Sequence, residues 1–323
     1  MVVAPAARAP QRRRSAFVER ALHRIRRDRI LLVLAVPGIL LILLFRYVPL
    51  LGNVIAFQDF QPFLGIFDSS WVGWDNFAIL SDPAFLNALG NTVVITLIQV
   101  VLVFPAPIVV ALLLNSLLSE RVKRVVQSVL YMPHFLSWVM VVAITQQLLG
   151  GTGIVNNALR SAELPTWDVI GSQDWFFTLI TTQVIWKDTG WATILFLAAL
   201  SRIDVGLYEA ASVDGAGRWR QLWHITLPGL RSIIILLLIL RLGEALNVGF
   251  EQILLQQPAV GIAASEVLDT YVYNNGIIGG NWGAAAAVGL LKGIVGVILV
   301  LGANKVAHLF GEPGLYESSR SAR

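Results

Sequence analysis

Glu209–Pro228 reads EAASVDGAGRWRQLWHITLP, a polar stretch between two long apolar segments. Its opening Glu-Ala-Ala favours a helix. Asp214-Gly215 should end that helix, because glycine readily adopts positive φ and aspartate forms local backbone hydrogen bonds. The apolar residues that follow recur at helical spacing before Pro228: they are Trp219, Leu222, Trp223 and Ile225. The stretch therefore predicts two short helices joined at a bend, a shape that can fit a groove on a soluble partner.

The composition is that of a membrane protein. Hydrophobic residues make up 56% of the 323 residues and charged residues 14%, and the mean hydropathy is +0.71. Soluble chains carry about 25% charged residues on average. The chain has no cysteine, which excludes disulfides and cysteine-based sites, and its histidines show no metal-ligand spacing.

Six segments are long and apolar enough to span a membrane, which takes about 20 residues. They are about Ile30–Gly52, Leu89–Leu114, Val129–Leu149, Phe177–Leu200, Ser232–Leu255 and Ala284–Ala307. We therefore predict an all-α membrane protein with six transmembrane helices.

The basic residues predict the orientation, since basic loops stay on the cytoplasmic side. Lys and Arg outside the spans gather in the N-terminal tail, in Asn115–Ser128, in Ser201–Arg231 and from Asn304 onward, whereas the opposite side holds Arg160 and no other basic residue. Both termini and the polar stretch are therefore expected in the cytoplasm. The expected parts are a basic cytoplasmic tail, a six-span domain and a cytoplasmic C-terminal tail, at 1–29, 30–310 and 311–323.

The polar stretch resembles the coupling loop of binding-protein-dependent ABC importer permeases. That family's pattern is Glu-Ala-Ala, two residues, Asp-Gly, nine residues, then Ile-x-Leu-Pro. The matching positions are Glu209, Ala210, Ala211, Asp214, Gly215, Ala216, Ile225, Leu227 and Pro228. The resemblance assigns these residues to ATPase coupling, in a loop at about 202–231.

Three further stretches resemble the carbohydrate-type permeases of this family, in particular the oligosaccharide and polysaccharide subgroup. An outer loop contains Trp71-Val72-Gly73 followed by Asn76-Phe77, Tyr131–Trp138 opens the third span, and Leu268–Tyr273 precedes the sixth. The resemblance implies a type I ABC importer permease fold in the bacterial inner membrane.

The chain is predicted not to be an enzyme and to bind no cofactor. It contains no Walker-type Gly-x-x-x-x-Gly-Lys-Ser/Thr, no Gly-x-Ser-x-Gly and no His-Glu-x-x-His. The resemblance implies that a separate ATPase dimer uses ATP and Mg, that a second homologous permease completes the path, and that an extracytoplasmic solute-binding protein delivers the sugar. Lipid is expected around the chain, and nucleic acid is not expected as a partner. Transport would follow alternating access.

Within the loop, Glu209 is expected to cap or charge the first helix and to pair with a basic ATPase residue, and Gly215 to supply the bend. Trp219, Leu222 and Trp223 have two interpretations, insertion into the ATPase or packing on the permease's own spans, and both remain open.

Charges inside spans cost about 2.5–3.5 kcal/mol each on insertion scales, so each needs a partner or a cavity. In the fifth predicted span, helical spacing places Glu244, Asn247 and Glu251 on one face of the helix, with Arg241 one turn earlier on that face. Aromatic rings suit the apolar faces of pyranoses, and carboxylates and amides bind hydroxyls. The predicted substrate path is Trp186, Lys187, Asp188, Trp191, Glu244, Asn247 and Glu251.

A structural interpretation competes with this path. Lys187–Asp188 and Arg241–Glu244 would then be ion pairs that fix helix packing. Lys292 is expected to pair across to the sibling subunit, and a lone histidine such as His134 is expected to be structural.

The sequence predicts an ATP-driven importer of sugars, with oligosaccharides favoured by the subgroup. An ion-coupled secondary transporter of a small solute is the alternative, using intramembrane Glu and Lys for coupling. A membrane-embedded enzyme acting on lipid or glycan is less consistent, because no span carries clustered His, Ser and Asp. Basic residues in the spans permit acidic sugars such as uronates, and neighbouring carboxylates could neutralise them, so the sequence leaves this open.

Overall fold

The computed structural model describes residues 29–309, 311 and 314. The predicted N-terminal tail, apart from Arg29, and the predicted C-terminal tail, apart from Gly311 and Gly314, lie outside these residues. The described chain is mostly helical, as expected for an all-α membrane protein.

Five helices of the described chain are long and apolar enough to cross a membrane by themselves: Arg29–Phe57, Pro83–Asn115, Trp138–Ser161, Arg218–Gly243 and Trp282–Leu309. A sixth candidate is α10 (Gln173–Leu200), which qualifies together with α11 (Val205–Val213), the two being bent by 70°. The predicted count of six is therefore reached when this bent pair is taken as one span.

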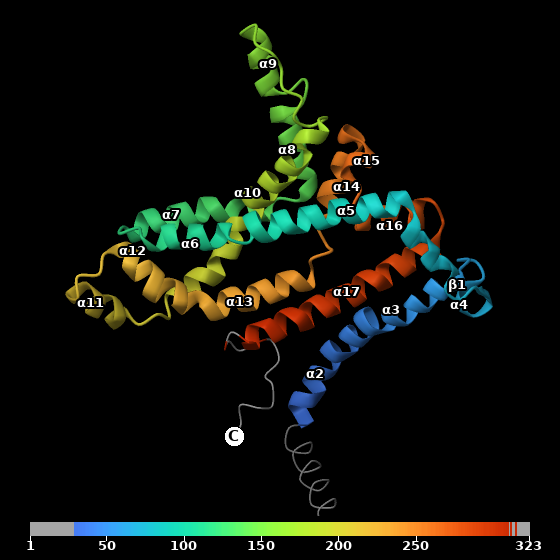
Figure 1. The fold of residues 1–323 in the computed structure, drawn as a ribbon, viewed down its shortest axis with the longest axis horizontal. Coiled ribbons are helices and arrows are strands. Elements are labelled where there is room, and N and C mark those ends of the chain that lie inside the picture. Colours follow the sequence, from blue (N-terminus) through green and yellow to red (C-terminus); the bar gives the residue numbers. More distant parts are fainter. Residues whose placement is uncertain (1–28, 310, 312–313, 315–323) are drawn as a thin grey trace, which may run out of the picture.

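The first span leaves the bundle (Figure 1). It consists of four consecutive helical pieces: α2 (Arg29–Ile42), a π-helical turn η1 (Leu43–Tyr47), α3 (Val48–Leu51) and a 3₁₀ turn η2 (Gly52–Phe57). No residue of α2, η1 or α3 is buried. Only η2 packs closely on the last span, α17 (Trp282–Leu309).

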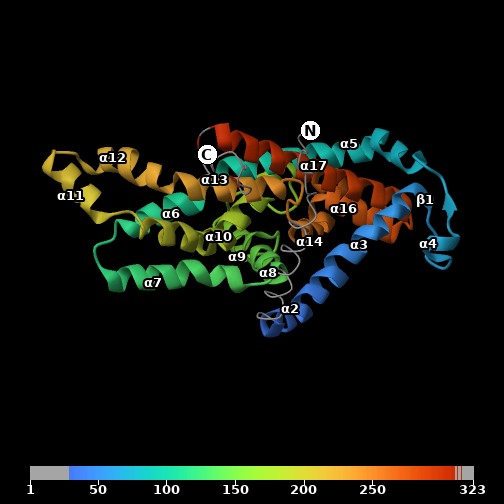
Figure 2. The same ribbon diagram turned by 90° about the horizontal axis from the view of Figure 1, so that it is seen from below.

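A small β-hairpin lies beyond the first span, at the end of the molecule opposite α11 (Figures 1 and 2). Its elements are β1 (Gln58–Asp59), α4 (Gly65–Asp68), the antiparallel β2 (Ser70–Trp71) and η3 (Asp75–Ser81). The Asn76 amide donates to the carbonyls of Ala56 (3.0 Å) and Gln58 (2.9 Å). The Phe57 and Trp71 rings stack 5.7 Å apart. Amide and ring contacts together fix this end of the fold.

The second span contains α5 (Pro83–Ile98), a π turn η4 (Gln99–Val103) and α6 (Ala106–Asn115). Asp82 caps α5 by accepting the Ala84 N–H (3.0 Å), and it also accepts the Tyr271 hydroxyl (3.0 Å). Burial, and then this bond and charge, raise the pKa of Tyr271. The hydroxyl therefore stays protonated and keeps its role as donor.

The third span begins later than predicted. Glu120–Tyr131 forms the amphipathic helix α7, followed by η5 (Met132–Phe135), α8 (Trp138–Leu149) and α9 (Ile154–Ser161). The expected continuous span Val129–Leu149 is wrong, because Leu136 and Ser137 are extended and Pro133 lacks a backbone donor. The Ser137 hydroxyl caps α8 by accepting the Met140 N–H (3.3 Å).

The remaining elements are α12 (Arg218–Gln221), η6 (Leu222–Thr226), α13 (Leu227–Gly243), α14 (Phe250–Val260), α15 (Ile262–Ser265), α16 (Leu268–Val272) and η7 (Tyr273–Ile278).

The fifth span ends earlier than predicted. A continuous helix over Ser232–Leu255 is wrong, because the chain leaves the helix after Gly243. Gly249 has φ +115°, a conformation that favours glycine, and α14 then starts in a new direction.

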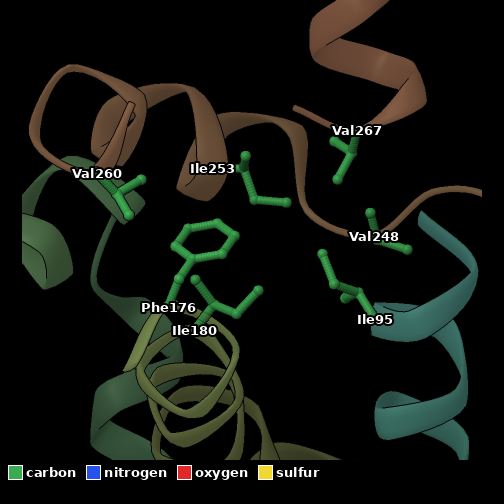
Figure 3. Close-up of a cluster of buried hydrophobic side chains, with 7 residues drawn as sticks. All are labelled: Ile95, Phe176, Ile180, Val248, Ile253, Val260 and Val267. Carbon is green, nitrogen blue, oxygen red and sulfur yellow. The ribbon is translucent and has the colours of Figure 1, made fainter. Parts of the chain in front are cut away.

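One buried apolar cluster joins α5, α10 and the segment that follows the α13 break (Figure 3). Its members are Ile95, Phe176, Ile180, Val248, Ile253, Val260 and Val267. Beside it, Gln252 donates to the Ile180 carbonyl (3.0 Å) and to the Gln183 side chain (2.7 Å). The break is thus packed into the bundle.

Helices α7 and α10 approach each other closely at Gly190. A Cβ built there would lie 1.9 Å from the Leu130 carbonyl oxygen and 2.5 Å from its carbon. Both atoms belong to the backbone, so no side chain can rotate away to make room.

Gly190→Ala should therefore lower the free energy of unfolding by about 1–3 kcal/mol, the usual cost of overpacking. Gly302→Ala is the matched control, because a Cβ on Gly302 meets nothing within 4 Å. Thermal or denaturant unfolding of the purified chain in detergent measures both. Equal stability of the two variants would contradict the close approach of α7 and α10.

Candidate functional site

The coupling segment, defined here as residues 202–231, forms one end of the molecule (Figures 1 and 2). Asp204 starts α11 by accepting the Gly206 N–H (2.9 Å). Helix α11 carries Glu209, Ala210 and Ala211, and α12 with η6 follows after the bend. The two short helices and the bend match the shape that the sequence predicts.

Gly215 makes the bend, with φ +75°. The Ala216 N–H donates to the Ala211 carbonyl (2.8 Å), and the Gly215 N–H donates to Ser212 (3.1 Å). This pair of bonds is a Schellman end, in which a left-handed residue satisfies the last carbonyls of the helix. A Cβ on Gly215 would meet nothing within 4 Å, so backbone conformation, and not lack of space, requires glycine.

Two polar side chains that the motif does not include hold the segment together. Gln221 donates to the Ser212 hydroxyl (2.9 Å) and to the Ala216 carbonyl (3.2 Å). The Tyr208 and Thr226 hydroxyls lie 3.0 Å apart in a hydrogen bond. Neither Gln221 nor Tyr208 belongs to the motif. At helical spacing Gln221 has polar neighbours such as Arg218 and His224, so no local pattern singles it out.

The outer surface of the segment is exposed. Glu209, Ala210, Asp214, Gly215 and Pro228 are all exposed, and Ala211, Ala216, Ile225 and Leu227 are half-buried. Trp219 and Trp223 are 76% and 63% exposed. Most of the surface of these two rings is therefore open to the surroundings.

Leu222 is less exposed than the two tryptophans. It is half-buried and, together with Trp219, lines a groove of about 580 Å³ between α6 and the coupling segment. Asn115 and Ser116, from the predicted basic loop after the second span, line the same groove. Leu222 therefore lies against the permease itself. Trp219 borders the same groove, but most of its ring and of the Trp223 ring is exposed.

A polar cluster joins η5 to the middle of α10. The Lys187 ammonium donates to the His134 carbonyl (2.7 Å) and lies 5.5 Å from the Trp138 ring centre. Asp188 Oδ1 lies 2.9 Å from His134 Nδ1 and 3.8 Å from Lys187 Nζ. The His134 ring stacks on Trp191 at 4.8 Å. The competing structural interpretation describes Lys187 and His134 well, since both fix η5 against α10.

A pocket of about 340 Å³ lies next to this cluster. It is called the polar pocket here after the charged and amide side chains in its otherwise mainly apolar lining. Its polar and aromatic lining comprises Gln99, Phe104, Trp138, Asp188, Thr189, Arg241, Asn247 and Gln252. Two residues of the predicted substrate path, Asp188 and Asn247, line it. Trp186, Lys187, Trp191, Glu244 and Glu251 do not.

The shared face expected for Glu244, Asn247 and Glu251 is wrong, because α13 ends at Gly243. Glu244 lies in the turn that follows, and Glu251 lies exposed in the first turn of α14. Arg241 closes no ion pair with Glu244 within 4.0 Å in the described chain. Its guanidinium donates instead to the Gln99 side-chain oxygen.

Lys292 forms an ion pair with Asp269 of its own chain. Lys292 thus has an internal partner on α16, and its expected pairing with the sibling subunit stays a prediction. The two residues line a second groove, of about 590 Å³, with Gly289 and Gly293. Among the described residues, no three His, Asp or Glu side chains are placed to hold a metal ion.

The family model described as "Binding-protein-dependent transport system inner membrane component" matches residues 103–310. This range contains the coupling segment and all of the predicted substrate path. The chain belongs to this family of membrane permeases. The permease is accordingly a transport subunit and not an enzyme, as predicted.

Two curated relatives match the permease over nearly its whole length. Protein LplB of Bacillus subtilis is 45% identical over 90% of this chain and 92% of its own. The polygalacturonan/rhamnogalacturonan transport system permease protein YteP of the same organism is 44% identical over 92% and 94%.

A solved structure supports the fold. A chain of a bacterial alginate ABC transporter, in complex with an alginate pentasaccharide-bound periplasmic protein, has a TM-score of 0.82 and 34% identity to the permease. The match covers 91% of this chain and 99% of that one. The predicted type I ABC importer permease fold is confirmed.

Lys187→Gln should lower the free energy of unfolding by about 1–3 kcal/mol, because the His134 carbonyl loses its donor and Asp188 loses a countercharge. Lys123→Gln is the matched control: the Lys123–Glu120 pair (3.8 Å) lies at the surface, with Glu120 68% exposed, and is expected to contribute less than about 1 kcal/mol. Thermal unfolding of the purified permease compares them. Equal losses would show that Lys187 does not fasten η5 to α10.

Proposed function

We propose that this permease carries oligosaccharides into the bacterial cell as one of two membrane subunits of an ATP-driven importer. The proposal is supported by the relatives named for polysaccharide transport and by the polar pocket, which combines an aromatic ring with amide and charged groups. Its volume of about 340 Å³ falls within the range of roughly 300–1,000 Å³ usual for ligand pockets.

The observation that carries the coupling role is the bent, exposed coupling segment. We expect α11 and Glu209 to contact an ATPase dimer, with Trp219 and Trp223 as its apolar anchors. Exposed aromatic residues on a helix bend are typical of an interface that a partner covers. The ATPase would use ATP and Mg, and the permease would bind no cofactor.

The orientation follows from the basic loops. Asn115 and Ser116 line the same groove as the coupling segment, so the two predicted basic loops lie side by side. We therefore place this end of the molecule, and both termini, in the cytoplasm. A sugar-loaded binding protein would then dock at the opposite end, where the β-hairpin lies.

An ion-coupled secondary transporter is the less favoured alternative. It requires titratable groups that a driving ion can reach. Lys187 and Lys292 instead have internal partners, His134 and Asp269, and membership of a binding-protein-dependent family is against ion coupling.

Gly215→Val should uncouple transport while the protein still reaches the membrane. A left-handed backbone costs a residue with a Cβ about 1–2 kcal/mol, and coupled transport should fall about tenfold. Transport of an oligosaccharide and binding-protein-stimulated ATP hydrolysis are measured in proteoliposomes containing the whole importer.

Gly217→Val is the matched control, since Gly217 has φ −69° and ψ 166°, which valine adopts readily, and a Cβ there meets nothing within 4 Å. If Gly215→Val transports as well as Gly217→Val, the bend does not couple the ATPase to the permease.

A further inference from the structure

The polar pocket contains one acidic and one basic side chain, Asp188 and Arg241. The two side chains differ in whether another charged group balances them. Asp188 is compensated from outside the pocket by Lys187 Nζ at 3.8 Å and by a hydrogen bond to His134 at 2.9 Å. Its negative charge is therefore satisfied without Arg241.

Among the residues that the structure describes, no carboxylate pairs with Arg241. The hydrogen bond of its guanidinium goes to Gln99, a neutral amide, and no Asp or Glu of the described chain lies within ion-pair distance. Glu244 attracts it only at longer range and does not line the pocket. The pocket with its immediate supports therefore carries one positive charge in excess.

Gln99 also fixes where that charge sits. It is 7% exposed, and its amide nitrogen donates to the Val248 carbonyl (3.1 Å) while its oxygen accepts from Arg241. Gln99 is thus fixed by its bond to Val248, and it in turn fixes the position of the Arg241 guanidinium. A guanidinium has five N–H donors in a rigid fork that matches a carboxylate bidentately.

We infer that Arg241 binds a carboxylate on the transported sugar, so that the permease is built for acidic, uronate-containing oligosaccharides. The inference rests on the proposed function and names its substrate class. Trp138 and Asn247 line the same pocket and supply an aromatic ring and an amide for the sugar ring and its hydroxyls. A neutral sugar would leave the half-buried positive charge without a countercharge.

The test compares a galacturonate trimer with its methyl ester, which keeps the rings and removes the charge. Affinity is measured by calorimetry on the assembled importer in nanodiscs without binding protein, so that the permease alone selects. A charge-assisted hydrogen bond contributes about 1.5–3 kcal/mol, which predicts roughly tenfold or greater preference for the acid. Arg241→Gln should reduce the ratio of the two affinities to about one, and Arg241→Lys should retain part of it.

Arg46→Gln is the matched control, since Arg46 lies in the uncovered first span, away from the pocket, and should keep the wild-type ratio. Size-exclusion chromatography verifies that each variant assembles. Equal affinities for acid and ester in the wild type, or an unchanged ratio in Arg241→Gln, would overturn the assignment of Arg241.

Different results would overturn the inference on Arg241 and the proposed oligosaccharide importer. If a neutral arabinose trimer or the ester is bound and imported without any preference for the acid, the inference on Arg241 falls and the oligosaccharide importer stands. If acid, ester and neutral trimer are all neither bound nor imported by the assembled complex, both fall.

Discussion

Side chains of the second span bind backbone carbonyls that the break after α13 leaves without helical partners. The Thr96 hydroxyl donates to the Ala245 carbonyl, and the Gln99 amide donates to Val248. An unpaired carbonyl in apolar surroundings costs several kcal/mol, so non-helical backbone at membrane depth needs such donors. The break after α13 therefore depends on side chains of α5 and η4 as much as on the sequence of the break itself.

The break links the polar pocket to the coupling segment. Helix α13 runs for 17 residues, Leu227–Gly243, without interruption, which corresponds to about 25 Å. Its start continues from η6 of the coupling segment, and its last turn carries Arg241 into the pocket. A displacement at the coupling segment would thus reach Arg241 through one continuous helix, while Gln99 remains on another span. Relative movement of the two would change the contact that orients the guanidinium.

The coupling segment is predicted well from sequence because its determinants are local. A helix that ends in Asp214-Gly215 needs only a glycine at positive φ and a few bonds within six residues. The α13 break is missed because Glu244, Asn247 and Glu251 keep helical spacing, and Gly249 alone is a weak signal. The donors that stabilise the break come from about 150 positions earlier, which no local pattern reports. The third span begins late for a more local reason, since Pro133 and the Ser137 cap were both visible in the sequence.

The predicted substrate path shows a second limit of prediction from sequence. Adjacent residues of a helix point about 100° apart, so Lys187 and Asp188 face in different directions. Spacing fixes the directions of side chains relative to one another, but the rotation of α10 about its axis is set by its neighbours, including the contact of Gly190 with α7. That rotation turns Asp188 to the pocket and Lys187 to the His134 carbonyl. It therefore makes the lysine a structural residue and leaves Arg241, from another helix, as the positive charge that the pocket presents.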